Sequence, residues 1–320
     1  MKVRFRYVAA LALVGLLTTT GAATAATLVD AVKRQDQAAV KAMLLRKVDV
    51  NAPQPDGATA LQWAASRNDV AIADLLVKAG AKADAANDYG VTPLSLAALN
   101  GSAAMLDLLL KAGANPNLAL PSGETPLMTA ARTGSVPAVT SLLNKGAQVD
   151  ASEPVAGQTA LLWALSERHL PVARALVDKG ANVQLASKAG FTPLMMAARV
   201  GHQEATAFLL EKGAPINTVA EDGTSALIVA VLRGHSDLAL YLLTKGADAK
   251  NDKAGYTALH WAAGKWESGM THDYPESDVE EWKYLNGVVA KKAELINALL
   301  EHGADINARL KTNPPRYGIH

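Results

Sequence analysis

The residues best suited to hold a metal ion or to transfer protons lie within a span of seven positions: His272, Asp273, Glu276 and Asp278. An imidazole and several carboxylates are the groups that divalent metals and acid–base catalysis use. Their spacing matches no known metal-ligand pattern, and carboxylates on a loop commonly serve only to keep a surface soluble. We therefore expect no metal site and no bound cofactor.

Other catalytic patterns are missing from the chain. There is no Cys for a thiolate nucleophile or metal ligand, and no G-x-S-x-G, H-E-x-x-H, phosphate-binding loop or dinucleotide fingerprint. The charge is balanced, with 31 Lys and Arg against 30 Asp and Glu, which disfavours a nucleic acid as partner. We expect no catalytic residues and predict that the protein is not an enzyme.

The elements that must position any functional side chain are repeated. A Thr or Ser, followed by Pro or Ala and then Leu, recurs at intervals of 32 to 34 residues, at Thr59, Thr92, Thr125, Thr159, Thr192, Ser225 and Thr257. Glycines recur at three positions of the same period, and these positions account for 18 of the 24 glycines. A period of this length indicates stacked units that bury a shared core.

The unit from Thr92 to Gly123 shows how one repeat is expected to fold. Thr92 supplies the N-cap of a first helix, and Pro93 suits the first helical position. Gly101 permits a tight turn into a second helix that carries a Leu pair on one face, and Gly113 ends that helix in a left-handed conformation. The polar stretch 115–123 is expected to form an extended hairpin loop that leads to the next unit.

The 33-residue period, the T-P-L-x-x-A helix start and the G-A-x-x-N helix end resemble the ankyrin repeat, over about residues 27–310. The resemblance implies an all-α ankyrin-repeat solenoid of helix pairs with hairpin loops, in which the first helices line a concave face. It predicts a capping half-repeat at 26–50, then about seven repeats over 51–307. It also implies that His202 and His235, each after a turn glycine, have structural roles.

Several positions depart from the family pattern. Lys47 stands where later units have the helix-ending Gly, while Asn68 and Arg168 replace the Gly between the two helices. The family's T-P-L-H histidine is present only as His260. The hydrogen bonds between repeats that this histidine supports in the family are therefore expected to be mostly missing. Trp63, Trp163 and Trp261, which share one repeat position, are expected to pack in the core.

The resemblance also implies a binding surface, formed by residues beside the hairpin glycines and at the ends of the first helices. We expect the following of these to contact a protein or peptide partner: Arg67, Tyr89, Asn100, Glu124, Arg132, Glu167, Lys188, Phe191, Arg199, Arg233 and Tyr256. Four of the arginines would form a ladder along the concave face, a composition that carries interface energy. Alternatively, they form salt bridges across repeats with Glu124, Glu167 and Glu221.

The last unit contains an insertion of roughly 25 residues, at 264–288, between its two helices. It is rich in acids and aromatics, and Trp266, Tyr274 and Trp282 are further candidates for partner contact. A capping box at 277–280 predicts a short helix over 278–286. The alternative is that the tryptophans only pack against the final unit.

The two ends differ from the repeats. Residues 1–25 combine three positive charges, an apolar run of ten residues and an Ala23-Thr24-Ala25 cleavage pattern, which predicts a cleaved Sec-type signal peptide and a periplasmic or secreted protein. An uncleaved anchor is the alternative. Residues 308–320 form either a tail that folds back or the start of a truncated next repeat.

Together these features predict a monomeric, non-catalytic scaffold outside the cytoplasm, which binds a protein or peptide on its concave face and hairpin tips and does not insert into the membrane after signal cleavage. The competing hypothesis is the front part, or a regulatory module, of a longer enzyme or enzyme complex.

Overall fold

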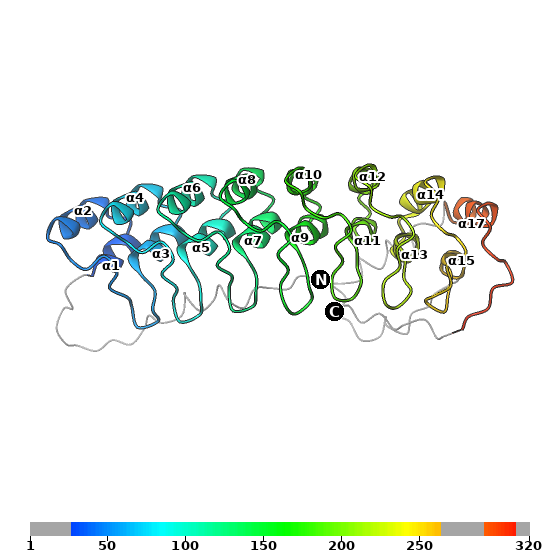
Figure 1. The fold of residues 1–320 in the computed structure, drawn as a ribbon, viewed down its shortest axis with the longest axis horizontal. Helices are drawn as coiled ribbons and strands as arrows, with labels where there is room; N and C mark the ends of the chain where they lie inside the picture. Colours follow the sequence, from blue (N-terminus) through cyan, green and yellow to red (C-terminus); the bar gives the residue numbers. More distant parts are fainter. Residues whose placement is uncertain (1–26, 264–290, 312–320) are drawn as a thin grey trace.

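The computed structural model describes residues 27–263 and 291–311 and shows an elongated stack of helix pairs (Figure 1). The first helices of the pairs are α1 (Leu28–Lys33), α3 (Ala60–Ser66), α5 (Pro93–Leu99), α7 (Pro126–Thr133), α9 (Ala160–Ser166), α11 (Pro193–Arg199), α13 (Ala226–Leu232) and α15 (Ala258–Ala263). The second helices are α2 (Gln37–Leu45), α4 (Val70–Lys78), α6 (Ala103–Lys111), α8 (Val136–Asn144), α10 (Leu170–Asp178), α12 (Gln203–Glu211), α14 (Ser236–Thr244) and α17 (Lys292–Glu301).

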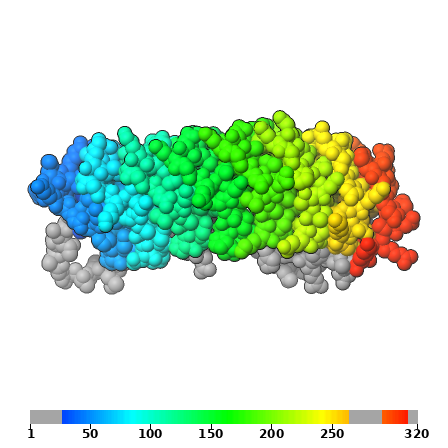
Figure 2. All heavy atoms as spheres, in the orientation of Figure 1, coloured from blue at the N-terminus to red at the C-terminus, as the bar shows by residue number. Residues whose placement is uncertain are grey.

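The helices form two rows, and the loops that join successive pairs all project from the side of the first helices (Figure 1). Each pair occupies one slice of the elongated body, so that the chain advances steadily along its long axis (Figure 2). The expected all-α solenoid is confirmed. In the described ranges the loop arms pair as strands only at two isolated bridges, Ser152 with Thr159 and Val219 with Ser225.

The predicted helix signals act as expected. The hydroxyl oxygen of Thr92 accepts a hydrogen bond from the amide of Ser95 at 3.1 Å. The equivalent Thr or Ser caps all the remaining first helices from α3 to α13 in the same way. All eighteen periodic glycines have positive φ. Lys47, Asn68 and Arg168, which stand at glycine positions, also have positive φ, between +53° and +62°. These residues keep the turn of the repeat at the cost of backbone strain.

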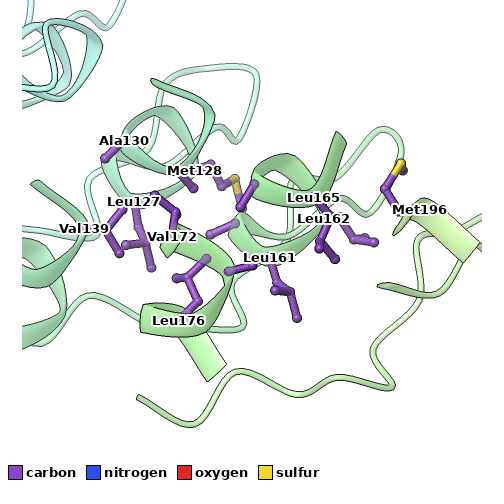
Figure 3. Packing of buried hydrophobic residues seen from close by; sticks show 14 of the residues in the cluster. Leu127, Met128, Ala130, Val139, Leu161, Leu162, Leu165, Val172, Leu176 and Met196 are labelled. Carbon is purple, nitrogen blue, oxygen red and sulfur yellow. The ribbon is translucent and has the colours of Figure 1, made fainter. Parts of the chain in front are cut away.

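The core runs without interruption between the two rows. Alanines at one repeat position of the first helices are fully buried and let neighbouring helices approach closely: Ala31, Ala64, Ala97, Ala130, Ala164, Ala197 and Ala230. The first leucine of each second-helix pair is equally buried, as at Leu142 and Leu176. Figure 3 shows Leu127 and Leu161 of the first helices among Val139, Val172 and Leu176 of the second helices. A single repeat exposes these side chains, and stacking buries them.

The two ends are more regular than the sequence suggested. Residues 28–45 form a complete helix pair, not a half-repeat, and Thr27 and Asp30 make a capping box at the start of α1. At the other end, α17 packs against α15 and α14 as the second helix of the last pair. Residues 308–311 continue along the preceding loop, where the amide of Lys311 donates to the carbonyl of Gly255 at 2.9 Å. The predicted signal peptide, the 264–288 insertion with its short helix, and the last nine residues lie outside the described ranges.

Asparagines at the helix-ending motif join neighbouring repeats. The side-chain amide of Asn51 donates to the carbonyl of Gly80 at 3.1 Å, and its oxygen accepts from the amide of Lys82 at 2.8 Å. Asn117 and Asn217 make the same two bonds to the repeats that follow them. Such paired bonds fix the register of one unit on the next.

The joint between the fifth and sixth helix pairs lacks this clamp. Gln184 occupies the asparagine position, and the next repeat presents Pro215, which has no amide hydrogen to donate. The second helices α10, α12 and α14 also approach one another less closely than α6, α8 and α10 do. Phe208, which is only 3% exposed, fills part of this space, with the guanidinium of Arg174 4.4 Å from its ring centroid.

Candidate functional site

The predicted binding surface lies along the first helices and the loops beside them. We call it the groove face, and its central row consists of the side chains at the fourth position of each first helix from α3 to α15: Trp63, Leu96, Thr129, Trp163, Met196, Val229 and Trp261. The three tryptophans pack against the core, as expected, but each remains partly exposed. The ammonium of Lys33 lies 4.2 Å from the ring centroid of Trp63, an arrangement that favours a cation–π interaction.

A small apolar notch opens on the groove face between the first and second loops. It is lined by Ala58, Gln62, Trp63, Ser66, Asn87, Val91 and Leu96. Two of the lining residues are bonded to each other, because the side-chain amide nitrogen of Gln62 donates to the carbonyl of Val91 at 2.5 Å. This bond joins two repeats, so Gln62 takes the role that histidine has in the family pattern. The expectation that such bonds are mostly missing agrees with the four positions that carry Met, Leu or Ile, but it did not foresee Gln62. The family histidine, His260, places its Nε2 3.1 Å from the carbonyl oxygen of Ala308.

Several predicted contact residues are exposed on the groove face. Arg67, Asn100, Glu167 and Lys188 are exposed, and Tyr89 is 54% exposed at a loop tip. Leu99, which the sequence analysis did not select, is 37% exposed at the end of α5. Its position at the end of a first helix, one place before Asn100, is the signal that could have identified it. These side chains are available to a partner without any change in the fold.

Some exposed candidates also hold the repeats together. The amide group of Asn100 donates to the carbonyls of Ala65 and Ser66, at 2.9 and 3.2 Å, and so caps the end of the preceding first helix. The ammonium of Lys188 donates to the carbonyl of Pro154 in the preceding loop. A structural role of this kind can accompany partner contact but is independent of it.

Glu124 and Arg132 form an ion pair within one repeat. The guanidinium of Arg132 lies 3.1 Å from the Glu124 carboxylate, and both side chains are less than one-fifth exposed. The hydroxyl of Thr129 donates to the same carboxylate at 2.9 Å, and the Arg132 guanidinium is 5.3 Å from the ring centroid of Trp163. Of the two alternatives for the arginines, salt-bridge formation therefore describes Arg132, although the bridge lies within a repeat and does not cross between repeats.

Tyr256 was expected to contact a partner, and this expectation is wrong for the structure described. The side chain is only 1% exposed, and its ring makes an edge contact with Trp261 at 5.6 Å between centroids. Its large apolar ring is better accommodated inside the last repeat than in water. Phe191, at the equivalent position two repeats earlier, is partly exposed and packs against the core.

The remaining candidates fall into two groups. Arg199 and Arg233 are partly exposed at the ends of their first helices. Trp266, Tyr274 and Trp282 lie outside the described residues, as does the cluster from His272 to Asp278. In the ranges that the structure does describe, no group of three His, Asp or Glu side chains is placed to hold a metal ion.

Two histidines bridge neighbouring repeats. Nε2 of His235 lies 3.2 Å from the carbonyl oxygen of Arg199, and Nε2 of His169 lies 3.1 Å from that of Arg132. Gly201 and Gly134 make room for these rings, because an added Cβ would lie 2.6 and 2.7 Å from the His235 and His169 rings. The structural role expected for His235 is thus consistent with its contacts.

Acid is expected to weaken this joint. Burial lowers the pKa of His235, and nearby Arg233 and Arg168 lower it further, against the opposing effect of the Arg199 carbonyl. Because the folded pKa lies below the ordinary value of about 6.5, stability is complete above that value and falls as the pH drops through the folded pKa. We expect the urea concentration at the unfolding midpoint to decrease when the pH is lowered from 7.5 to 5. His235→Asn should make this pH dependence weaker, whereas the substitution of the exposed His302 by Asn should not change it. Equal pH dependence in all three proteins would contradict this assignment.

Along the part of the chain that the structure describes, no helix has the length and apolar character needed to cross a membrane. The groove face holds a hydroxyl beside a carboxylate, at Thr129 and Glu124, and a hydroxyl beside an imidazole, at Thr257 and His260, at 2.9 and 2.8 Å. What it offers is an extended surface of aromatic, aliphatic and charged side chains.

Comparisons with known proteins agree with this architecture. A family model described as ankyrin repeats in three copies matches residues 28–119, 113–187, 179–251 and 194–270. The chain is similar to the crystal structure of the human ASB11 ankyrin repeat domain, at 28% identity, with a TM-score of 0.62, over 69% of this chain and 97% of that one. It is also similar to the ankyrin repeat domain of Bcl-3, described as a unique member of the IkappaB family, at 28% identity, with a TM-score of 0.58, over 64% and 94% of the two chains.

The chain belongs to the ankyrin repeat family. A search of curated proteins gave no match by sequence. Ankyrin repeats generally mediate protein–protein interactions, and proteins built from them are typically interaction scaffolds without enzymatic activity.

Proposed function

We propose that this protein is a scaffold outside the cytoplasm that binds a protein or peptide partner on its groove face and loop tips. One observation carries the proposal. The groove face exposes large side chains that the core does not require, above all Tyr89 and Leu99, and it also carries the exposed Arg67 and the partly exposed Trp63. Aromatic side chains and arginine are the residue types that most often dominate binding energy at interfaces.

Affinity capture with paired variants tests the binding surface. The groove variant carries Arg67→Glu, Tyr89→Ala and Leu99→Ser, all at exposed positions. The control variant carries Lys111→Glu and Lys145→Glu, which are exposed at the ends of second helices on the other row. We expect the groove variant to recover its partner from an extract of the producing cells at least tenfold less well, as loss of interface anchors implies. Equal recovery by both variants would overturn the proposal.

The location outside the cytoplasm depends on the signal-like segment at 1–25. Cleavage after Ala25 leaves a mature chain that begins at Ala26, directly before the capping box of α1. N-terminal sequencing of the protein purified from its native cells should therefore begin at Ala26. A protein that retains Met1 and is found in the cytoplasm would contradict this part of the proposal.

A further inference from the structure

The last described repeat exposes an apolar position that earlier repeats cover. The position directly precedes that of the clamping asparagines, and in four earlier repeats it is at most 8% exposed, at Val50, Ala83, Val183 and Ala249. The other three earlier repeats bury it in part. In the last repeat the same position is Ile306, which is 73% exposed. Val50 belongs to the first helix pair, which has a following repeat but no described preceding one. The position is therefore covered by the repeat that follows it.

The first repeat exposes an apolar side chain on the opposite end of the stack. Val48 is 39% exposed, whereas the equivalent residue of every later repeat is an alanine. From Ala114 to Ala304 these alanines are at most 9% exposed. Ala304 belongs to the last described repeat, so this position is covered where a preceding repeat is present. We call the surface around Val48 the N-terminal end face and the surface around Ile306 the C-terminal end face.

The polar groups of the two end faces match as well. Asn307 stands at the position where Asn51 and Asn117 bond to the next repeat, and it is exposed. Those asparagines bind the carbonyl of the residue that ends the next second helix and the amide two residues later. The corresponding groups of the first repeat are the carbonyl of Lys47 and the amide of Asp49, and both residues are exposed. Lys47 has a φ of +54°, in the same left-handed region as the glycines that it replaces.

The charges at the two end faces are also opposite where a joint would bring them together. Inside the stack, the ammonium of Lys212, the cap residue after α12, lies 3.6 Å from the carboxylate of Asp178, the last residue of α10. The last residue of α17 is Glu301, and the cap residue after α2 is Arg46. Two end faces that meet as consecutive repeats do bring Glu301 opposite Arg46. Such pairs contribute mainly to the choice of partner and its register.

We propose that the C-terminal end face of one copy of this protein binds the N-terminal end face of a second copy, in the manner of consecutive repeats. The occupant is a second copy because each face carries the half of a repeat joint that the other lacks. The faces lie at opposite ends of the elongated body, so the contact joins different copies (Figure 1). A contact between unlike faces leaves one face of each kind free, and further copies can add to it. The inference goes beyond the proposed function, does not involve the groove face, and departs from the monomer predicted from the sequence.

Two variants each disable one end face. Ile306→Glu places a charge on the C-terminal end face, and Val48→Glu places one on the N-terminal end face. Val155→Glu is the control, because it makes the same change at a loop tip in the middle of the stack that is 80% exposed. Sedimentation velocity of the purified, untagged full chain measures assembly from low micromolar to millimolar concentration. Circular dichroism confirms that the variants fold.

We expect the unchanged protein and the control to form larger species as the concentration rises, while each end-face variant alone stays monomeric. An equimolar mixture of the two end-face variants should form a dimer and nothing larger. The Val48→Glu copy keeps an intact C-terminal end face and the Ile306→Glu copy an intact N-terminal end face, so one contact forms and growth stops. This result distinguishes a contact between unlike faces from a symmetric dimer.

The charge match is tested separately. Glu301→Lys should weaken association about threefold, as expected for an exposed ion pair. Glu211→Lys makes the same change at the last residue of α12, inside the stack, and should leave association unchanged. Equal weakening by both variants would show a general charge effect and would contradict the proposed register of the two copies.

Three results would overturn the inference. The first is a protein that stays monomeric at every concentration; if Ile306→Glu then lowers its urea midpoint, another segment of the same chain covers this position. The second is an end-face variant that associates with itself as strongly as the unchanged protein does. The third is a mixture of the two end-face variants that remains monomeric, because the two intact faces then do not bind each other. The capture experiment with the groove variant decides the proposed function independently of all three.

Discussion

Replacing Gly223 with alanine is expected to lower the free energy of unfolding by roughly 3–4 kcal/mol, through backbone strain and overpacking together. Gly223 has a φ of +82°, and an added Cβ would lie 2.3 Å from the backbone of both Lys253 and Ala254 in the next loop. Backbone atoms cannot move aside as the end of a flexible side chain can. The substitution therefore forces the last two repeats apart.

Gly213 provides the matched control. Its φ of +86° is almost the same, but nothing lies within 4 Å of an added Cβ. Gly213→Ala should therefore cost only the left-handed backbone penalty, about 1 kcal/mol. Urea unfolding of both variants, followed by circular dichroism, measures the difference. Equal destabilisation would show that the close approach between loops does not exist in solution.

Most of the fold could be predicted from the sequence, because each unit is specified by residues a few positions apart. The caps at Thr92 and its equivalents, the glycine positions and the buried leucines all follow from local rules of helix formation. The joints between repeats could not be predicted as well. Gln62 substitutes for the family histidine, and whether a side chain reaches the next repeat depends on geometry that a single unit does not contain.

The candidate site was predictable in outline but not in detail. Repeat position placed Arg67, Tyr89 and Asn100 on the exposed groove face. The same rule failed for Tyr256, because an aromatic ring of that size can fill the interior of its own repeat. Position alone also could not show that Arg132 is held in an ion pair with Glu124. Pairing depends on whether a carboxylate stands at the neighbouring loop position, as Glu124 does.

The Glu124–Arg132 pair is expected to make the second large contribution to stability. Arg132→Met removes the cation and leaves the carboxylate of Glu124 mostly buried, where the Thr129 hydroxyl still donates to it. We expect a loss of about 2 kcal/mol, smaller than for a fully buried pair because both side chains keep some exposure. Glu124→Gln in the same chain removes the unpaired charge and should recover about half of this loss.

A double-mutant cycle measured by urea unfolding tests this prediction. The two single variants and the double variant should show a coupling energy of at least about 1 kcal/mol, the part of the Arg132→Met loss that the double variant recovers. Additive effects would mean that the two side chains do not interact, and Arg132 would then return to the set of candidate partner contacts. Gln54→Ala, which leaves the indole of Trp63 without its 2.9 Å acceptor, is a reference for losing one neutral hydrogen bond on the same face.

Site-specific photo-crosslinking tests the central claim most directly. A photoreactive amino acid is placed at Leu99 on the groove face, and in a second protein at Lys145 on the row of second helices. Both are exposed, so both can react with a protein that lies against them. We predict a discrete protein adduct from position 99 in the producing cells, and none from position 145. An adduct formed only at position 145 would contradict the claim that the groove face is the binding surface.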